Sequence, residues 1–269
     1  MRLRIRHCTT YRFEAPQARL VQLMRLTPAN HAGQSVLHWG IEVDHDARLR
    51  RGRDGYGNAT TMLYVDGPLD AITIAVAGEV LTEDRAGVLA GIAEPLPPLA
   101  FLQPTPLTAA DAEVRAFAAG LDLPDDPLGR AHALMEGVHD RLGPAPPSVD
   151  TDQRASARLA EGQADPQGAA HLLIAAARAS GVPARYVAGH LHRPEAEQGH
   201  AAHGWAELHV EGYGWIGFDP YLGACPADRH VRVAIGLDHA QAGPVAGTRH
   251  GPGAETLSVD VHVERQSAA

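Results

Sequence analysis

The chain has 269 residues, 45% of them hydrophobic, which is enough material for one large domain or two modest ones. Its formal net charge of −9 argues against general nucleic-acid binding, and no apolar run reaches the roughly 18 residues that a membrane-spanning helix needs. The Arg-rich start lacks the apolar stretch of a signal peptide, and two distant cysteines, Cys8 and Cys225, suggest no disulfide framework. We therefore expect a cytoplasmic protein that does not act on a membrane.

The first 94 residues predict a β-sandwich domain. Leu3, Ile5 and His7 alternate with arginines, which is the period of a strand with one polar face. Glycines and an asparagine in residues 53–58 predict a tight turn. Further strand-like segments cover residues 11–13, 20–26, 36–43, 60–65 and 71–81. Several short strands separated by turn signals are typical of an antiparallel sandwich.

A segment with five prolines, residues 95–106, predicts a linker, and helices are expected after it. Thr108, with Asp111 three residues later, resembles a capping box at the start of the first helix. Residues 127–142 carry apolar side chains at helical spacing and predict the second helix. Neither helix carries residues that indicate a chemical function.

A buried helix is predicted to begin at Pro166. Asp165 is a good N-cap residue, and proline is favoured at the first helical position, where its missing N–H is not needed. Gly181 is expected just beyond the end of this helix, before a strand over residues 184–191. Two more strands follow, one bearing His203 and one ending in Asp219. Helix, His-bearing strand and Asp-bearing strand, in this order, have the layout of a papain-like thiol site without its thiol.

The motifs in this stretch resemble those of the bacterial transglutaminase-like proteins. That family's core runs roughly G-x-C-[QR]-D-x-A-H-L, then H-A-W, then G-W-x-x-F-D-P. Here residues 164–172 read Ala-Asp-Pro-Gln-Gly-Ala-Ala-His-Leu, residues 203–205 read His-Gly-Trp, and residues 214–220 read Gly-Trp-Ile-Gly-Phe-Asp-Pro. The Asp-x-x-Gly-Asn turn and the later stretch 228–236 also resemble the family. The resemblance implies an α+β fold: a papain-like transglutaminase core over residues 107–269, with a C-terminal closing strand, behind the N-terminal β-sandwich.

The same resemblance assigns roles to residues. It places Pro166 in the slot of the nucleophilic cysteine, His203 at the general base and Asp219 at the acid that orients it. Trp205 and Trp215 are expected to line the groove. In thiol sites of this kind the helix N-terminus helps to hold the thiolate, and the nucleophile's own N–H helps to stabilise the oxyanion. Because proline supplies neither group, the sequence predicts a pseudoenzyme that needs no cofactor and binds a protein or peptide in the former groove.

Two alternatives keep an enzymatic function open. One is an amidase, peptidase or transamidase with a relocated nucleophile, for which Cys225 is the candidate. The other is a metal-dependent hydrolase, because His190 and His192 at i and i+2 share one side of a strand and, with His203 and Asp219, supply metal ligands. The remaining histidines that we considered are expected to be surface or packing residues: His31, His38, His45, His132, His230 and His239.

Overall fold

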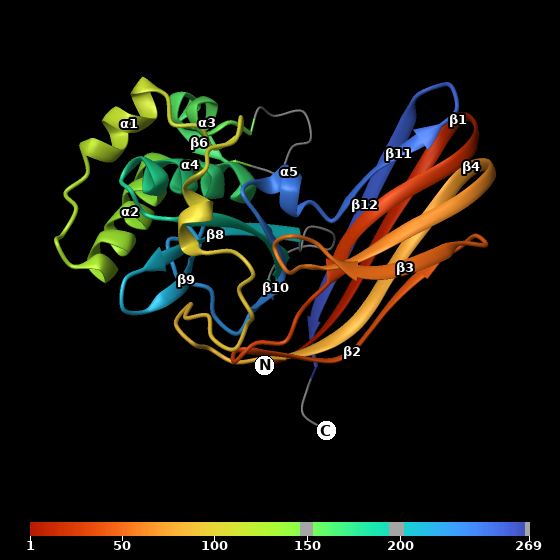
Figure 1. Ribbon diagram of the computed structural model, residues 1–269, viewed down its shortest axis with the longest axis horizontal. Coiled ribbons are helices and arrows are strands. Elements are labelled where there is room, and N and C mark those ends of the chain that lie inside the picture. Colours follow the sequence, from red (N-terminus) through yellow and green to blue (C-terminus); the bar gives the residue numbers. More distant parts are fainter. Residues whose placement is uncertain (146–152, 194–201, 267–269) are drawn as a thin grey trace.

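The computed structural model describes residues 1–145, 153–193 and 202–266, and it has an α+β fold. A region of long strands lies beside a smaller sheet that is covered by helices (Figure 1). The strands are β1 (Arg2–Thr27), β2 (Gln34–Val43), β3 (Arg48–Arg53), β4 (Ala59–Thr82), β5 (Gly143–Pro144), β6 (Gln163–Ala164), β7 (Ala184–Leu191), β8 (Ala202–Val210), β9 (Gly214–Phe218), β10 (His230–Gly236), β11 (Val245–His250) and β12 (Glu255–Arg265). The helices are η1 (Pro98–Leu102), α1 (Ala112–Ala119), α2 (Pro127–Arg141), α3 (Ala155–Glu161), α4 (Pro166–Ala179) and α5 (His239–Ala242). None of the helices in the described ranges is both long and apolar enough to cross a membrane.

The β region is one hydrogen-bonded six-stranded sheet, whereas the sequence predicted the separate short strands of a sandwich. The two central strands, β1 and β4, run through both halves, so the three segments expected between residues 2 and 26 form one strand. Their pairing changes register between Arg12 and Arg19, where the sheet's two halves meet. At this point a Cβ on Gly67 would lie 1.9 Å from the carbonyl oxygen of Gln17, so only glycine allows the backbones to approach so closely.

The last strand, β12, belongs to this same sheet. It pairs with β1 along its length, from Leu3 opposite Arg265 to Phe13 opposite Glu255, and β11 pairs with the other end of β1. Figure 1 shows both strands, in blue, beside β1 in red. The predicted division placed the closing strand with the core, but the structure pairs it with β1, where Val261 becomes buried and the edge of β1 gains a partner.

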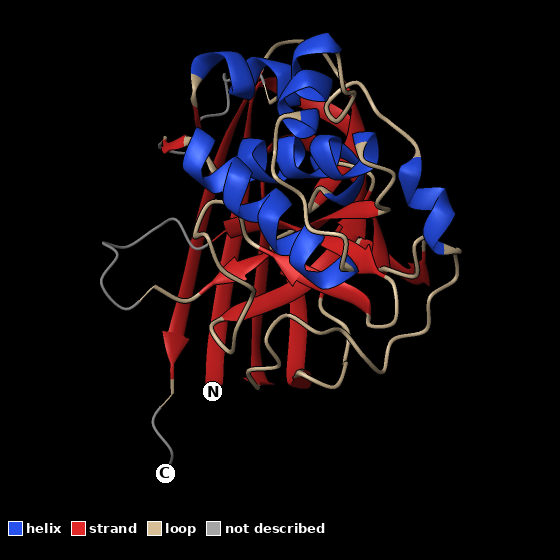
Figure 2. Ribbon diagram, turned by 90° about the vertical axis from the view of Figure 1, so that its left-hand side faces the viewer, coloured by secondary structure: helices blue, strands red, loops and turns tan. Residues whose placement is uncertain are grey.

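The core consists of an antiparallel four-stranded sheet, in the order β10-β7-β8-β9, with α4 against one face. Helices α1, α2 and α3 pack against α4, and Figure 2 shows helices gathered over the strands. Helix α4 begins as predicted, because the Asp165 side chain accepts a hydrogen bond from the Gly168 N–H and Pro166 is the first helical residue. Leu172, Leu173 and Ile174 are fully buried in the cluster that this helix forms with the sheet.

Two predicted details of the helical layer are corrected. Helix α1 is capped by Asp111, which accepts from the Val114 N–H, whereas the Thr108 hydroxyl accepts a hydrogen bond from Arg178 and therefore does not cap the helix. Helix α3 was not predicted, because its seven residues are too few to show a clear helical period. It is amphipathic enough to bury Ala155 and Leu159 against α4.

Two side-chain amides connect the β region to the edge of the core sheet. Gln34 bonds to both the N–H and the C=O of Arg232 on β10, and Asn58 does the same for Ile235. Each amide therefore satisfies the backbone groups of an edge strand as a neighbouring strand would. The Asp54 carboxylate accepts hydrogen bonds from the side chain and backbone of Asn58, which explains why this turn needs its acid and its amide.

The proline-rich segment that was predicted to be a linker packs on the core. Residues 98–102 form η1, and the Phe101 ring is 1% exposed in contact with Trp215. Glu94 forms a bidentate ion pair with the buried Arg185 on β7. The segment therefore covers the face of the four-stranded sheet on which Arg185 and Trp215 lie.

Candidate functional site

A buried pair of a histidine and an aspartate lies at the ends of two neighbouring strands. His203 is on β8 and Asp219 directly follows β9, and the antiparallel pairing of the two strands brings the side chains together. The His203 Nε2 is 2.6 Å from the Asp219 Oδ2, and both side chains are fully buried. The contact predicted between these two residues is therefore present, at hydrogen-bond distance.

A second histidine shares the same carboxylate oxygen. The Nε2 of His230, on β10, is 3.2 Å from the Asp219 Oδ2, and the backbone N–H of Ala227 donates to the His230 Nδ1. The other carboxylate oxygen accepts from the backbone N–H groups of Tyr221 and Leu222. Burial by itself raises the pKa of Asp219, but charge and hydrogen bonds from the two histidines outweigh it and hold that pKa well below its usual range.

These contacts fix the tautomer of both rings. A carboxylate only accepts hydrogen bonds, so each imidazole carries a proton on Nε2 and, in its neutral form, none on Nδ1. The His203 Nδ1 is then a bare acceptor, like the His230 Nδ1 that receives the Ala227 N–H. Unlike the latter, the His203 Nδ1 is buried with no hydrogen-bond partner among the described residues. This atom is the one that a general base would use to take a proton.

The helix start beside this acceptor carries no thiol. Pro166 is buried at the first position of α4, and the next residue, Gln167, lines the same pocket as His203. This pocket lies between the β region and the core, is open to solvent, and has a cavity volume of about 50 Å³. In the family that the motifs resemble, the nucleophile stands in the position of Pro166. Here that position offers neither a sulfur atom nor an N–H.

Cys225 does not have the properties of a replacement nucleophile. It is half-buried against the helical core, and no hydrogen bond joins it to His203, although both lie in the described part of the chain. Burial and the nearby charge of Asp84 raise the pKa of the Cys225 thiol, whereas a nucleophilic cysteine needs a lowered one. The geometry therefore gives no support to a relocated thiol.

The histidines proposed as metal ligands do not converge either. Within residues 1–145, 153–193 and 202–266, one group has ligand atoms within 4.8 Å of one another, namely His203, Asp219 and His230. His190 and His192 do not belong to it, and the His192 Nδ1 is 3.0 Å from the carbonyl oxygen of Val263. The predicted set of His190, His192 and His203 is thus not assembled, because β7 ends at Leu191 and its alternation stops there.

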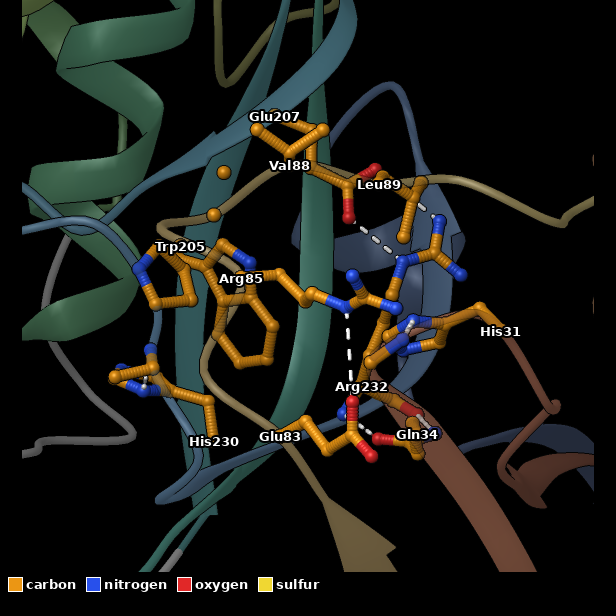
Figure 3. A pocket seen from close by; sticks show the side chains of 15 residues that line it. His31, Gln34, Glu83, Arg85, Val88, Leu89, Trp205, Glu207, His230 and Arg232 are labelled. Carbon is orange, nitrogen blue, oxygen red and sulfur yellow. Dashed lines mark hydrogen bonds and ion pairs between the residues drawn. The ribbon is translucent and has the colours of Figure 1, made fainter.

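The two tryptophans lie on the face of the four-stranded sheet that points away from α4. Trp205, whose ring centre is 6.2 Å from that of His203, lines a second pocket of about 50 Å³ together with His230 and Arg232 (Figure 3). Trp215 is 5% exposed beneath the guanidinium of Arg185, which is 3.9 Å from its ring centre, and it lines neither pocket. The Asp219 centre therefore lies between two pockets, with His203 at one and His230 at the other.

A buried ion-pair network forms the floor of the second pocket. Glu207 accepts hydrogen bonds from Arg185 and Arg232, with shortest distances of 2.6 Å to each. Burial by itself raises the pKa of Glu207, but the two guanidinium groups lower it to about 2. Figure 3 shows Arg85 and His31 entering the same pocket from the side of the β region. Glu207 pairs with Arg185 and Arg232, so the network links strands β7, β8 and β10 of the sheet.

Three histidines outside the predicted site contribute to its surroundings. His230 bonds to Asp219, and His7 and His239 line the pocket of His203. Of these, His230 could have been identified from the sequence, because it lies in the 228–236 stretch that resembles the family. The positions of His7 on β1 and His239 on α5 depend on how the β region packs on the core, which local sequence does not reveal.

Comparisons with known proteins agree with this geometry. The family model for the bacterial transglutaminase-like N-terminal region matches residues 3–81, and the model for the transglutaminase-like superfamily matches residues 115–220. An uncharacterized protein of Mycobacterium leprae is 26% identical over 275 residues, with 98% of this chain and 99% of that protein aligned. An uncharacterized protein of Mycobacterium tuberculosis is 28% identical over 295 residues, with 98% of this chain and 92% of that protein aligned.

One solved structure shares the fold along the whole chain. It is the crystal structure described as "a Putative Cysteine Protease from Cytophaga hutchinsonii", with a TM-score of 0.77 and 18% sequence identity. The match covers 100% of this chain and 92% of that one, and at this identity it shows the fold alone. Because both family regions occur in order on one chain that has this fold, the protein is a bacterial transglutaminase-like protein with a papain-like core.

Proposed function

We propose that this protein performs no thiol chemistry and instead binds a protein or peptide segment in the pocket beside its former catalytic centre. The observation that carries the proposal is Pro166 at the first position of α4, one residue before Gln167, which lines the same pocket as His203, while the pair of His203 and Asp219 is intact. The base and its orienting acid remain, but the group on which they would act is missing. Losing a nucleophile typically costs several orders of magnitude in rate.

The second loss at this position is the backbone N–H. One such donor to an oxyanion contributes about 3 kcal/mol of transition-state stabilisation. Proline has none, so even an external nucleophile would meet an incomplete site. The raised pKa of Cys225, caused first by burial, argues against a thiolate from that residue.

The pocket itself supports a binding role. It lies between the β region and the core, and residues from both sides line it, among them Leu26 from β1 and Tyr186 from β7. The solved structure with the same fold is described as "a Putative Cysteine Protease", and the present chain has this fold with Pro166 at the start of α4.

The test is an amine-incorporation and peptide-hydrolysis panel on the purified protein, with and without iodoacetamide. We expect no iodoacetamide-sensitive turnover from the wild-type protein. If such turnover is found and then disappears in Cys225→Ser, the proposal is wrong and Cys225 is the nucleophile. Chelator-sensitive turnover would instead indicate a metal at His203, Asp219 and His230. Binding is measured separately, by display selection of random peptides on the immobilised protein.

A matched variant tests whether His203 and Asp219 can still support thiol chemistry. We expect Pro166→Cys to restore weak thiol-dependent activity at most, with Pro166→Cys/His203→Ala as the inactive control. Rescue is limited because the family's acid two residues on is replaced by Gly168. A Cβ at this position would lie 2.6 Å from the Cδ of Arg158, a side chain that is 2% exposed. Arg158 therefore occupies the space in which the family's acidic side chain would lie.

A further inference from the structure

The strand β3 concentrates positive charge on a protein whose net charge is negative. Residues 48–53 read Arg-Leu-Arg-Arg-Gly-Arg, and no other six-residue stretch of the sequence contains four arginines. The formal net charge of the whole chain is −9, so this strand is opposite in charge to the molecule that carries it. All six residues are exposed. A local excess of positive charge at the surface attracts an anionic partner.

The charge of this strand is not neutralised within the molecule. None of its four arginines forms an ion pair with a carboxylate in the described part of the chain. Arg53 donates a hydrogen bond to the carbonyl oxygen of Gly57, and the guanidinium carbon of Arg48 is 4.8 Å from the ring centre of Tyr64. Both contacts leave the guanidinium groups charged and exposed.

The carboxylates closest in sequence to the strand do not change this balance. Asp54, just after β3, forms its ion pair with Arg25 at 2.8 Å. Asp44, before β3, accepts a hydrogen bond from the backbone N–H of Thr73. Asp46 is exposed two residues before the strand begins, and it can offset only one of the four positive charges.

The strand also has an edge without a partner. It pairs with β4 alone, from Arg48 opposite Tyr64 to Arg53 opposite Ala59, and the register is unbroken (Figure 1). Backbone groups of alternate residues point away from β4, and no backbone hydrogen bond joins them to another described residue. Proteins protect such an edge with a proline, a bulge or charged side chains, and β3 has only the charges.

The side chains of β3 divide between the two faces of the sheet. Leu49 lies opposite the buried Leu63 and therefore on the inner face, where alternation also places Arg51 and Arg53. The other two arginines lie on the outer face. Leu49 is 41% exposed, because no further strand covers it. A strand added at this edge would therefore meet positive charge on both faces and one apolar side chain.

We propose that β3 binds an extended acidic segment of a partner protein, which joins the sheet as an additional strand. Backbone hydrogen bonds to the open edge hold the segment, and the arginines select acidic side chains opposite them. No residue of β3 lines either of the two pockets described above. The inference is therefore a second binding surface, and it does not depend on the proposed function of the pocket beside His203.

The test is calorimetric titration of the full chain with the peptide acetyl-Glu-Thr-Glu-Glu-Val-Glu-amide. In antiparallel pairing this peptide places an acid opposite each arginine and valine opposite Leu49. The same peptide with glutamine in place of every glutamate should bind at least tenfold more weakly. Arg50→Gln/Arg51→Gln should weaken binding of the acidic peptide at least tenfold. Arg6→Gln/Arg12→Gln, at exposed positions on β1, is the matched control and should bind like the wild type.

Two further peptides distinguish strand addition from attraction between charges. One carries N-methyl groups at its odd positions and the other at its even positions, so each lacks the N–H donors of one edge. Only one edge of an added strand faces β3, so we expect one of these peptides to bind at least tenfold more weakly than the other.

Three outcomes would overturn the inference. Equal binding of the two N-methylated peptides would mean that no strand is added. Tighter binding of single-stranded DNA or of phosphatidylserine vesicles than of the acidic peptide would mean that the anionic partner belongs to another class. If the acidic peptide does not bind even at millimolar concentration, the arginines only protect the edge of the sheet.

Discussion

The strand half and the helix half of the candidate site differ in how closely they match the motifs that this stretch resembles. The strand half keeps a histidine, an aspartate and a second histidine in hydrogen-bond contact, all buried. The helix half has Pro166 at the position where the motif that it resembles has cysteine, and α4 begins there with a normal N-cap. A helix accepts proline at its first position without loss of a hydrogen bond. The start of α4 therefore forms without a thiol-bearing residue at that position.

The strand half has no such freedom, and the reason is structural. Asp219 accepts hydrogen bonds from two histidine rings and from the backbone of Tyr221 and Leu222. If the carboxylate were removed, several buried donors would be left without a partner. A base and an acid retained at a catalytic position are therefore no evidence of catalysis when the fold itself depends on them.

The largest effect is expected for Asp219→Ala. We predict a loss of about 3–5 kcal/mol in the free energy of unfolding, because a buried charged partner of several donors is removed. Urea denaturation followed by circular dichroism measures it. The matched control is Asp66→Ala, whose exposed ion pair with Arg19 should contribute little. A loss as small as that of the control would mean that the strand half is not a structural requirement.

The next largest effect is a loss of unfolding free energy at acidic pH. Burial lowers the pKa of His190 to about 3, below the value of about 6.5 in an unfolded chain. Below pH 6.5 the unfolded state therefore binds a proton that the folded state does not. The free energy of unfolding is thus unaffected by this histidine above pH 6.5 and declines as the pH falls toward 3. Replacing the ring with phenylalanine should reduce the loss of unfolding free energy between pH 7 and 4.5 by on the order of 2 kcal/mol.

Denaturation curves at the two pH values, for the wild type and His190→Phe, provide the measurement. His38→Phe, at an exposed position, should keep the wild-type dependence. If the free energy of unfolding falls by the same amount between the two pH values in all three proteins, His190 is not held neutral by its surroundings.

The smallest effect is expected in the helix half. Pro166→Ala should change the free energy of unfolding by less than about 1 kcal/mol, since alanine also suits the first turn and only the entropy of the unfolded chain changes. The same urea experiment measures it beside Asp219→Ala. A loss above about 3 kcal/mol would make Pro166→Ala as destabilising as Asp219→Ala. It would contradict the interpretation that the fold does not depend on the residue at this position.

Local pattern was sufficient to predict much of this molecule. The start of α4 at Pro166, the bounds of β7 and the contact of His203 with Asp219 follow from capping, alternation and motif spacing. In each case the deciding interactions lie within a few residues or between adjacent strands. Such features can be predicted from the sequence of the segment in which they occur.

The features that local pattern did not predict depend on distant contacts. The continuity of β1 depends on how Gln17 meets Gly67 in the neighbouring strand, and the role of His230 depends on where β10 places it against Asp219. His192 was expected to point with His190, but β7 ends one residue before it. Alternation predicts a shared face only while the strand continues.

The pairing of β12 with β1 has a consequence for how the molecule comes to be folded. Leu3 pairs with Arg265, so β1 leaves the ribosome well before β12, the strand that completes its sheet. Until then β1 presents an open edge, which is the kind of surface that pairs with other chains. We expect the whole core to be synthesised before the β region closes, and the nascent chain to be most prone to aggregation during that interval.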